Sequence, residues 1–260
     1  TGDYPSALTK SKEQLSKIQK DNPDYLRLLY QYGTVLIYVQ NTKGAYDAYT
    51  EVLNGLETKY GEDLSYAIVE GYLAYLEQDL GDLVAAEKHY LEAIYISKKL
   101  QATETEEYAS TLNNLAMLYS DLGRFKPAIQ YTEEVLMLFE KLVGKEHDAY
   151  STALNNLGLL YENIGRYDKA EEYYWNSIQI TEKLVGKKHP SYAMRLLNIA
   201  AIYRLLGRYS DAEPLYLEAD SVLLATIGAK HPAYASLMHN KALLFTYMNR
   251  NEEAERLYLN

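Results

Sequence analysis

The sequence predicts an all-α fold in which antiparallel helix pairs, about 13 helices in all, stack in a row as a solenoid. The first observation is a period of 42 residues, marked by Gly81, Gly123, Gly165 and Gly207, with Asn249 where the next glycine would fall. The second is a set of small and aromatic residues with the same spacing. They are Ala86, Ala128, Ala170, Ala212 and Ala254, and Tyr66, Tyr108, Tyr150, Tyr192 and Tyr234. A period of this size indicates units that bury their apolar faces against their neighbours.

We expect the whole chain to form one such array, with boundaries set by the glycine register. Both ends favour a piece taken from a longer array, since the chain opens in mid-repeat and the last repeat stops early. Natural caps with a polar outer face are the alternative. The expected units are 1–20 as a second helix without its partner, an irregular repeat at 24–60, regular repeats at 64–104, 105–146, 147–188 and 189–230, and a truncated repeat at 231–260.

The irregular repeat is predicted as a helix over 24–40, a turn over 41–44 and a second helix over 45–60. From Gly44 to Gly81 there are 37 residues, five fewer than the period. This register puts Tyr49 where the other repeats have alanine. It predicts a local change in the pitch of the array and not a domain boundary.

The unit at 147–188 shows the regular pattern. Leu154, Leu157, Gly158 and Tyr161 have spacings of three and four residues, so they share one face of a helix. Gly165 follows the last turn and can adopt the positive φ that ends a helix. Small residues at fixed sites, such as Gly158, allow the two helices of a pair to approach closely.

The second helix of this unit begins near Tyr167 and places Ala170 and Tyr174 on one face. In the next two repeats, the pairs His189-Pro190 and His231-Pro232 open the first helix. Proline is favoured at the first helical position because its φ is already fixed and no needed N–H is lost.

These patterns carry a family resemblance. The core LNNLAxLYxxxGRYxxAExxY and the junction LVGxxHPxYA resemble the tetratricopeptide repeat in the 42-residue form of kinesin light chains. They are also similar to bacterial arrays that precede a caspase-like CHAT protease domain. The resemblance is strong over 64–260 and weak over 2–61. It implies a right-handed superhelix whose concave groove is lined by the first helix of each pair.

Composition excludes several kinds of function. The net charge of -10 argues against nucleic acid and anionic membranes as partners. The absence of cysteine removes disulfides and thiolate metal sites, and it fits a reducing compartment. We therefore expect a cytoplasmic protein, although the chain opens in mid-repeat and targeting cannot be judged from it.

No sequence motif for catalysis is present, so the sequence predicts a protein that is not an enzyme and needs no cofactor or metal. His147, His189 and His231 share one repeat position, as metal ligands could. However, helices one repeat apart lie about 8–10 Å or more from each other, whereas a shared zinc needs bonds of about 2 Å. These rings are better explained as residues that cap the start of a helix.

The groove that the resemblance implies gives the candidate site. An asparagine column along it could bind successive peptide groups of an extended ligand, because an amide both donates and accepts hydrogen bonds. Alternatively, each asparagine ties its helix to the loop of the adjacent repeat, and both roles can hold together. The candidate binding residues are Asn113, Asn114, Met117, Asn155, Asn156, Leu159, Leu197, Asn198, Arg204, His239, Asn240 and Leu243.

Arg195, Arg204 and Arg208 form a basic group in an acidic chain, which could meet an acidic ligand segment or be solvated surface. We interpret the chain as a non-catalytic scaffold that binds a peptide or partner domain in its groove. A regulatory arm of a larger enzyme, such as a CHAT-type protease, is the alternative. Exposed ends would also allow end-to-end self-association.

Overall fold

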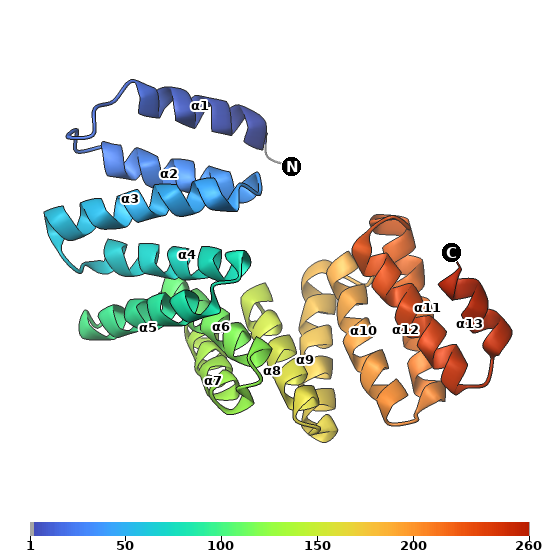
Figure 1. The fold of residues 1–260 in the computed structure, drawn as a ribbon. Helices are drawn as coiled ribbons and strands as arrows, with labels where there is room; N and C mark the ends of the chain where they lie inside the picture. Colours follow the sequence, from blue (N-terminus) through green and yellow to red (C-terminus); the bar gives the residue numbers. More distant parts are fainter. Residues whose placement is uncertain (1–2, 260) are drawn as a thin grey trace. The chain divides into compact units, whose positions relative to one another are not determined.

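The computed structural model describes residues 3–259, and in that range it contains 13 helices and no strand (Figure 1). Within α1–α6 and within α8–α13, consecutive helices pack against each other, and successive first helices (α4 with α6, α8 with α10, α10 with α12) are also neighbours. This confirms the prediction of an all-α solenoid. The chain divides into two compact units, one ending at Tyr131 and the other beginning at Thr132.

The helices alternate as the first and second members of pairs after α1. Their bounds are α1 Tyr4–Ser16, α2 Tyr25–Tyr38, α3 Thr42–Tyr60, α4 Leu64–Leu80, α5 Leu83–Lys99, α6 Glu106–Asp121, α7 Phe125–Leu142, α8 Asp148–Asn163, α9 Tyr167–Val185, α10 Pro190–Leu205, α11 Tyr209–Thr226, α12 Pro232–Tyr247 and α13 Asn251–Tyr258.

Side chains at the helix starts satisfy backbone N–H groups that lack a partner within the helix. The Nδ1 atoms of His147, His189 and His231 accept hydrogen bonds from the backbone N–H two residues later, at 3.2, 3.2 and 3.1 Å. The three histidines therefore cap α8, α10 and α12, which confirms the capping interpretation. Pro190 and Pro232 follow as the first helical residues.

The irregular repeat has a different turn from the one that the glycine register predicts. Gln40 adopts the positive φ of 59° that ends α2, and the side chain of Asn41 accepts a hydrogen bond from the backbone N–H of Gly44. As a result α3 begins at Thr42, and Gly44 lies inside its first turn. The predicted turn over 41–44 is wrong because a glutamine, and not a glycine, holds the left-handed position.

This turn restores the register of the repeat. From Gln40 to Gly81 there are 41 residues, one fewer than the period. Ala45, fully buried, then occupies the alanine position, and Tyr49, also fully buried, corresponds to Tyr90 of α5. The placement of Tyr49 at the alanine position is therefore wrong, and so is the five-residue deletion.

A small residue on a first helix faces a tyrosine ring on its partner helix. A Cβ atom added to Gly33 would lie 3.2 Å from the ring of Tyr49, and one added to Gly158 would lie 2.5 Å from that of Tyr174. Both rings are fully buried. Small residues at this position thus make room for the ring that fills the core of the pair.

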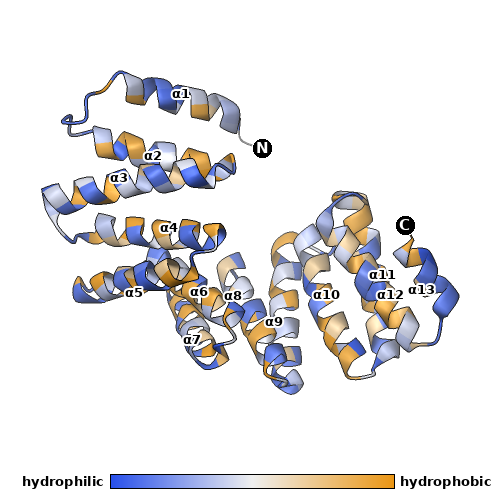
Figure 2. Cartoon of the chain, in the orientation of Figure 1, coloured by the Kyte–Doolittle hydropathy of each residue, from blue (hydrophilic) through white to orange (hydrophobic). Residues whose placement is uncertain are grey.

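Adjacent repeats are joined by a recurring polar contact. The carboxylate of Glu87 on α5 accepts hydrogen bonds from the hydroxyl of Tyr119 at 3.0 Å and from Arg124 at 2.8 Å. The same three residue types recur in the second unit as Glu171, Tyr203 and Arg208. Figure 2 shows hydrophobic and hydrophilic residues along the same helices, in keeping with amphipathic packing. No helix in residues 3–259 combines the length and apolar character that crossing a bilayer requires.

Candidate functional site

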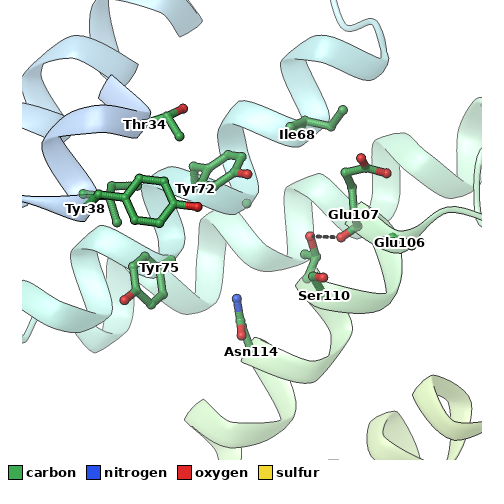
Figure 3. Close-up of a pocket in the computed structure, with 12 residues that line it drawn as sticks. Thr34, Tyr38, Ile68, Tyr72, Tyr75, Glu106, Glu107, Ser110 and Asn114 are labelled. Carbon is green, nitrogen blue, oxygen red and sulfur yellow. Dashed lines mark hydrogen bonds between the residues drawn. The ribbon is translucent and has the colours of Figure 1, made fainter. Parts of the chain in front are cut away.

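An open hollow of about 520 Å³ lies in the first unit, on the side formed by the first helices α2, α4 and α6. Figure 3 shows Tyr38 of α2 with Tyr72 and Tyr75 of α4 on one side of it, and Asn114 of α6 on another. A second hollow of about 390 Å³ shares Tyr75 and Asn114 with the first and adds Met117. We call the two hollows together the first-unit groove.

Aromatic rings form much of the groove surface. Tyr38 is 60% exposed and Tyr75 is 44% exposed. Tyr72 is half-buried, and its ring stacks on buried Tyr49 with centroids 5.2 Å apart. Burial raises the pKa of Tyr49 to about 12, so its hydroxyl stays neutral. The buried ring therefore supports an aromatic surface that faces the groove.

Two of the residues predicted from sequence, Asn114 and Met117, line this groove. Asn113 is half-buried and already engaged in an interaction. Gly71, Tyr72 and Tyr75, which stand 42 residues before these three, also line the groove and were not predicted. The 42-residue register could have indicated them, since a glycine and two tyrosines stand there in place of two asparagines and a methionine.

In the second unit, the asparagine column is partly used within the fold. The side-chain amide of Asn198 on α10 donates a hydrogen bond to Oδ1 of Asn155 on α8 at 2.8 Å. Asn156 is half-buried and also has a partner. At Asn198, the amide ties two neighbouring first helices together, whereas the expected tie was to a loop of the adjacent repeat. The side-chain N–H groups of Asn155 are not used in this bond.

The other candidates of the second unit are spread along its first helices. Leu159, Leu197 and Leu243 are half-buried, as is Asn240. His239 is exposed, and its ring lies edge-on to that of Tyr258, with centroids 6.0 Å apart.

Arg204 belongs to a polar network between helix pairs. The hydroxyl of Tyr174 on α9 donates to Oε2 of Glu162 on α8 at 2.8 Å. Burial raises the pKa of Glu162, while Tyr174 and Arg204 act in the opposite sense. Arg204 also faces the hydroxyl of Tyr216 and lies 5.8 Å from the ring of Tyr247. Much of its charge is therefore directed at groups of this chain.

The basic group predicted around Arg195 and Arg208 is neutralised in the fold. Arg195 is buried and lies 3.7 Å from Oδ1 of Asp148, with a hydrogen bond to Thr152. Arg208 pairs with Glu171 and with Asp211. The interpretation of these arginines as a site for an acidic segment is not favoured by this geometry, because their partners lie within the chain.

Comparison with known proteins agrees with this architecture. The family profile of the tetratricopeptide repeat matches residues 65–141, 149–220 and 196–259. No curated protein sequence matches the chain significantly. Among solved structures, BtubC (BKLC) from P. vanneervenii has a TM-score of 0.75 and 23% identity, over 89% of this chain and 95% of that one.

Two further structures share the fold. A putative kinesin light chain from P. anserina, with nearly identical TPR-like repeats, has a TM-score of 0.64 and 21% identity, over 75% of this chain and 93% of that one. A Rap protein in complex with Competence and Sporulation Factor has a TM-score of 0.67 and 16% identity, over 98% of this chain and 77% of that one. The chain belongs to the tetratricopeptide repeat family, and its repeats are similar to those of kinesin light chains.

Proposed function

We propose that the chain is a non-catalytic scaffold that holds an extended peptide segment of a partner protein on the face formed by its first helices. The observation that carries the proposal is the first-unit groove, where exposed tyrosines and an asparagine amide surround an open hollow. Such a surface offers apolar area to side chains and hydrogen bonds to peptide groups.

Family membership supports the proposal, since tetratricopeptide repeats are typically interaction scaffolds. A related example is the Rap protein, which has this fold and was solved in complex with a factor. In the second unit, we propose that the side-chain N–H groups of Asn155, which the bond with Asn198 does not use, and the neighbouring leucines, Leu159 and Leu197, contribute to the same kind of binding. We place this role in the cytoplasm, in keeping with the lack of cysteine.

The alternative is a regulatory arm of a larger enzyme, for example a CHAT-type protease. The two roles agree on the groove and differ in what is attached to it. Sequence adjoining this chain would separate them, because a catalytic domain there would carry its own nucleophile and base.

Selection from a random peptide library on the immobilised chain tests the scaffold proposal. The selected peptides should bind the wild type and lose about tenfold or more in affinity to Tyr75→Ala, because that change removes an exposed ring from the groove. Tyr95→Ala is the matched control, since Tyr95 is 59% exposed on α5 and does not line the groove. A library that yields no binder, or binders equally sensitive to both variants, would contradict the proposal.

A further inference from the structure

One residue that lines the first-unit groove departs from the repeat. Gly71 on α4 occupies the position held by Asn113, Asn155, Leu197 and His239 in the later repeats. A Cβ atom placed at Gly71 would lie 2.9 Å from Oγ1 of Thr111 on α6. Glycine inside a helix costs about 0.5–1 kcal/mol relative to alanine. The glycine therefore allows α4 and α6 to approach each other closely beside the hollow.

The charges around the groove have one sign. Glu106 and Glu107 line the first hollow, and Asp79 and Asp121 line the second. All four are exposed, and neither hollow is lined by a lysine, arginine or histidine. Within the described range 3–259, none of the four forms an ion pair. A concave surface with carboxylates alone attracts cations, because the local potentials add.

Aromatic rings line the same hollow as Glu106 and Glu107. Figure 3 shows Tyr38, Tyr72 and Tyr75 on one side of this hollow and the two glutamates on the other. A guanidinium or ammonium group is attracted to the face of such a ring. The chain uses this contact itself, since the guanidinium of Arg208 lies 4.0 Å from the ring centroid of Tyr203. The ammonium of Lys169 lies 4.6 Å from that of Tyr161.

We propose that the ligand of the first-unit groove is a cationic peptide segment, with an arginine or lysine side chain in the hollow that Gly71 helps to line. In this arrangement the tyrosine rings contact the cationic group, and Glu106 and Glu107 neutralise its charge. Asp79 and Asp121 meet a second basic residue further along the segment. Asn114, between the two hollows, hydrogen-bonds the peptide backbone. The inference rests on the proposed function and adds the chemistry of the partner.

The test uses a labelled peptide of alternating arginine and serine, and the same peptide with citrulline for arginine. Citrulline keeps the shape of the side chain and removes its charge. Fluorescence anisotropy on the full chain should show about tenfold or more tighter binding of the arginine peptide, and this difference should shrink at high salt because exposed charges are screened.

Three variants locate the binding. Gly71→Asn inserts the residue found at Asn113 and Asn155, and it should lower the affinity for the arginine peptide about tenfold. Gly71→Ala checks that added bulk alone leaves the helices folded. Glu106→Gln with Glu107→Gln should weaken it to a similar degree. The control pair Glu172→Gln with Glu252→Gln removes two exposed charges elsewhere and should leave binding within about twofold.

The outcomes separate the two proposals. Library-selected peptides that need an intact groove but prefer neutral or acidic residues would overturn the cationic inference and leave the scaffold role standing. Equal binding of the arginine and citrulline peptides, or equal loss in the control pair, would also overturn it, because attraction would then come from the net charge of the whole chain. Selected peptides that tolerate both Gly71→Asn and Tyr75→Ala would overturn both proposals.

Discussion

Replacing His89 tests whether a buried polar cluster holds the α4–α5 pair together. Its ring lies between two carboxylates of α4, those of Glu70 and Glu77, and its Nε2 atom is 3.4 Å from Oε1 of Glu77. The side chains of Glu70 and Glu77 are 4% and 6% exposed. In the next repeat, the corresponding positions are apolar or aromatic: Leu112, Tyr119 and Tyr131.

The magnitude follows from burial of the carboxylates. His89→Leu would leave two acidic groups out of water without their cationic partner, and breaking a buried pair in this way costs about 3–5 kcal/mol. The combination Glu70→Leu, Glu77→Tyr and His89→Tyr instead restores the residue types of the next repeat. Replacing a whole buried ionic group by packed apolar residues is often neutral or stabilising by about 1–4 kcal/mol.

The cluster also gives stability a pH dependence. The hydrogen bond with Glu70 raises the pKa of His89 above its usual 6.5, against the effect of burial. Burial raises the pKa of Glu77 above its usual 4.5, with His89 and Tyr46 acting in the opposite sense. Each of the two groups therefore keeps its proton up to a higher pH in the folded state than in the unfolded state. The stabilisation by His89 is therefore complete below about pH 6.5 and is lost as pH rises through its raised pKa.

Other titratable groups around the cluster also affect how stability depends on pH. The hydroxyl of Tyr66 lies near Glu70. Lys88 adds a positive charge near His89, and Asp82 adds a negative charge near Glu77. These groups remain in the triple variant, which lacks His89. We therefore expect the triple variant to show no loss of stability between about pH 6 and pH 8.

Urea unfolding followed by circular dichroism at about pH 6 and about pH 8 measures both effects through the midpoint. The control His239→Leu removes an exposed histidine and should change stability by about 0.5 kcal/mol at most. The reasoning fails if His89→Leu unfolds at the wild-type midpoint. It also fails if the triple variant is less stable than His89→Leu, or keeps the wild-type dependence on pH.

Three further changes probe the second unit. Ala170→Leu overpacks a fully buried helix contact and should lower the free energy of unfolding by about 1–3 kcal/mol; an unchanged thermal melt would contradict the helix pairing. Ser151→Ala removes a buried hydroxyl that lies 2.9 Å from that of Thr181, and should cost about 1–3 kcal/mol in urea unfolding, whereas a neutral result would mean that the hydroxyls are not needed. Asn156→Ala with Asn198→Ala should weaken a library-selected peptide about two- to tenfold while the helical signal is kept; loss of that signal would assign the asparagines to the fold.

Two residues of the candidate site could be predicted from the repeat alone. The register places Asn114 and Met117 on the first helix of their pair, and the structure places both at the groove. Gly71 and Tyr75 escaped notice because they differ from the repeat, although the same register aligns them with Asn113 and Met117. A site can thus be marked by a departure from a pattern as well as by the pattern.

The error in the irregular repeat has a local cause. The glycine register predicts the turn at Gly44, because glycine is the usual residue at positive φ. Gln40 takes that conformation, and Asn41 caps the next helix. Single residues other than glycine do occupy this region at a modest cost, so glycine spacing does not by itself fix a helix end.

The sequence by itself determined the helix pairs, their order and the faces that they bury, because a helix of period 3.6 must repeat its apolar residues to find a partner. Only the tertiary structure decided which polar groups are used within the fold. Asn198 is tied to Asn155, and Arg195 lies against Asp148, whereas Glu106 and Glu107 remain without a cationic partner in the described part of the chain. Such pairings depend on side chains of different repeats meeting in space, and a repeat pattern records the position of each residue but not the direction in which its polar group points.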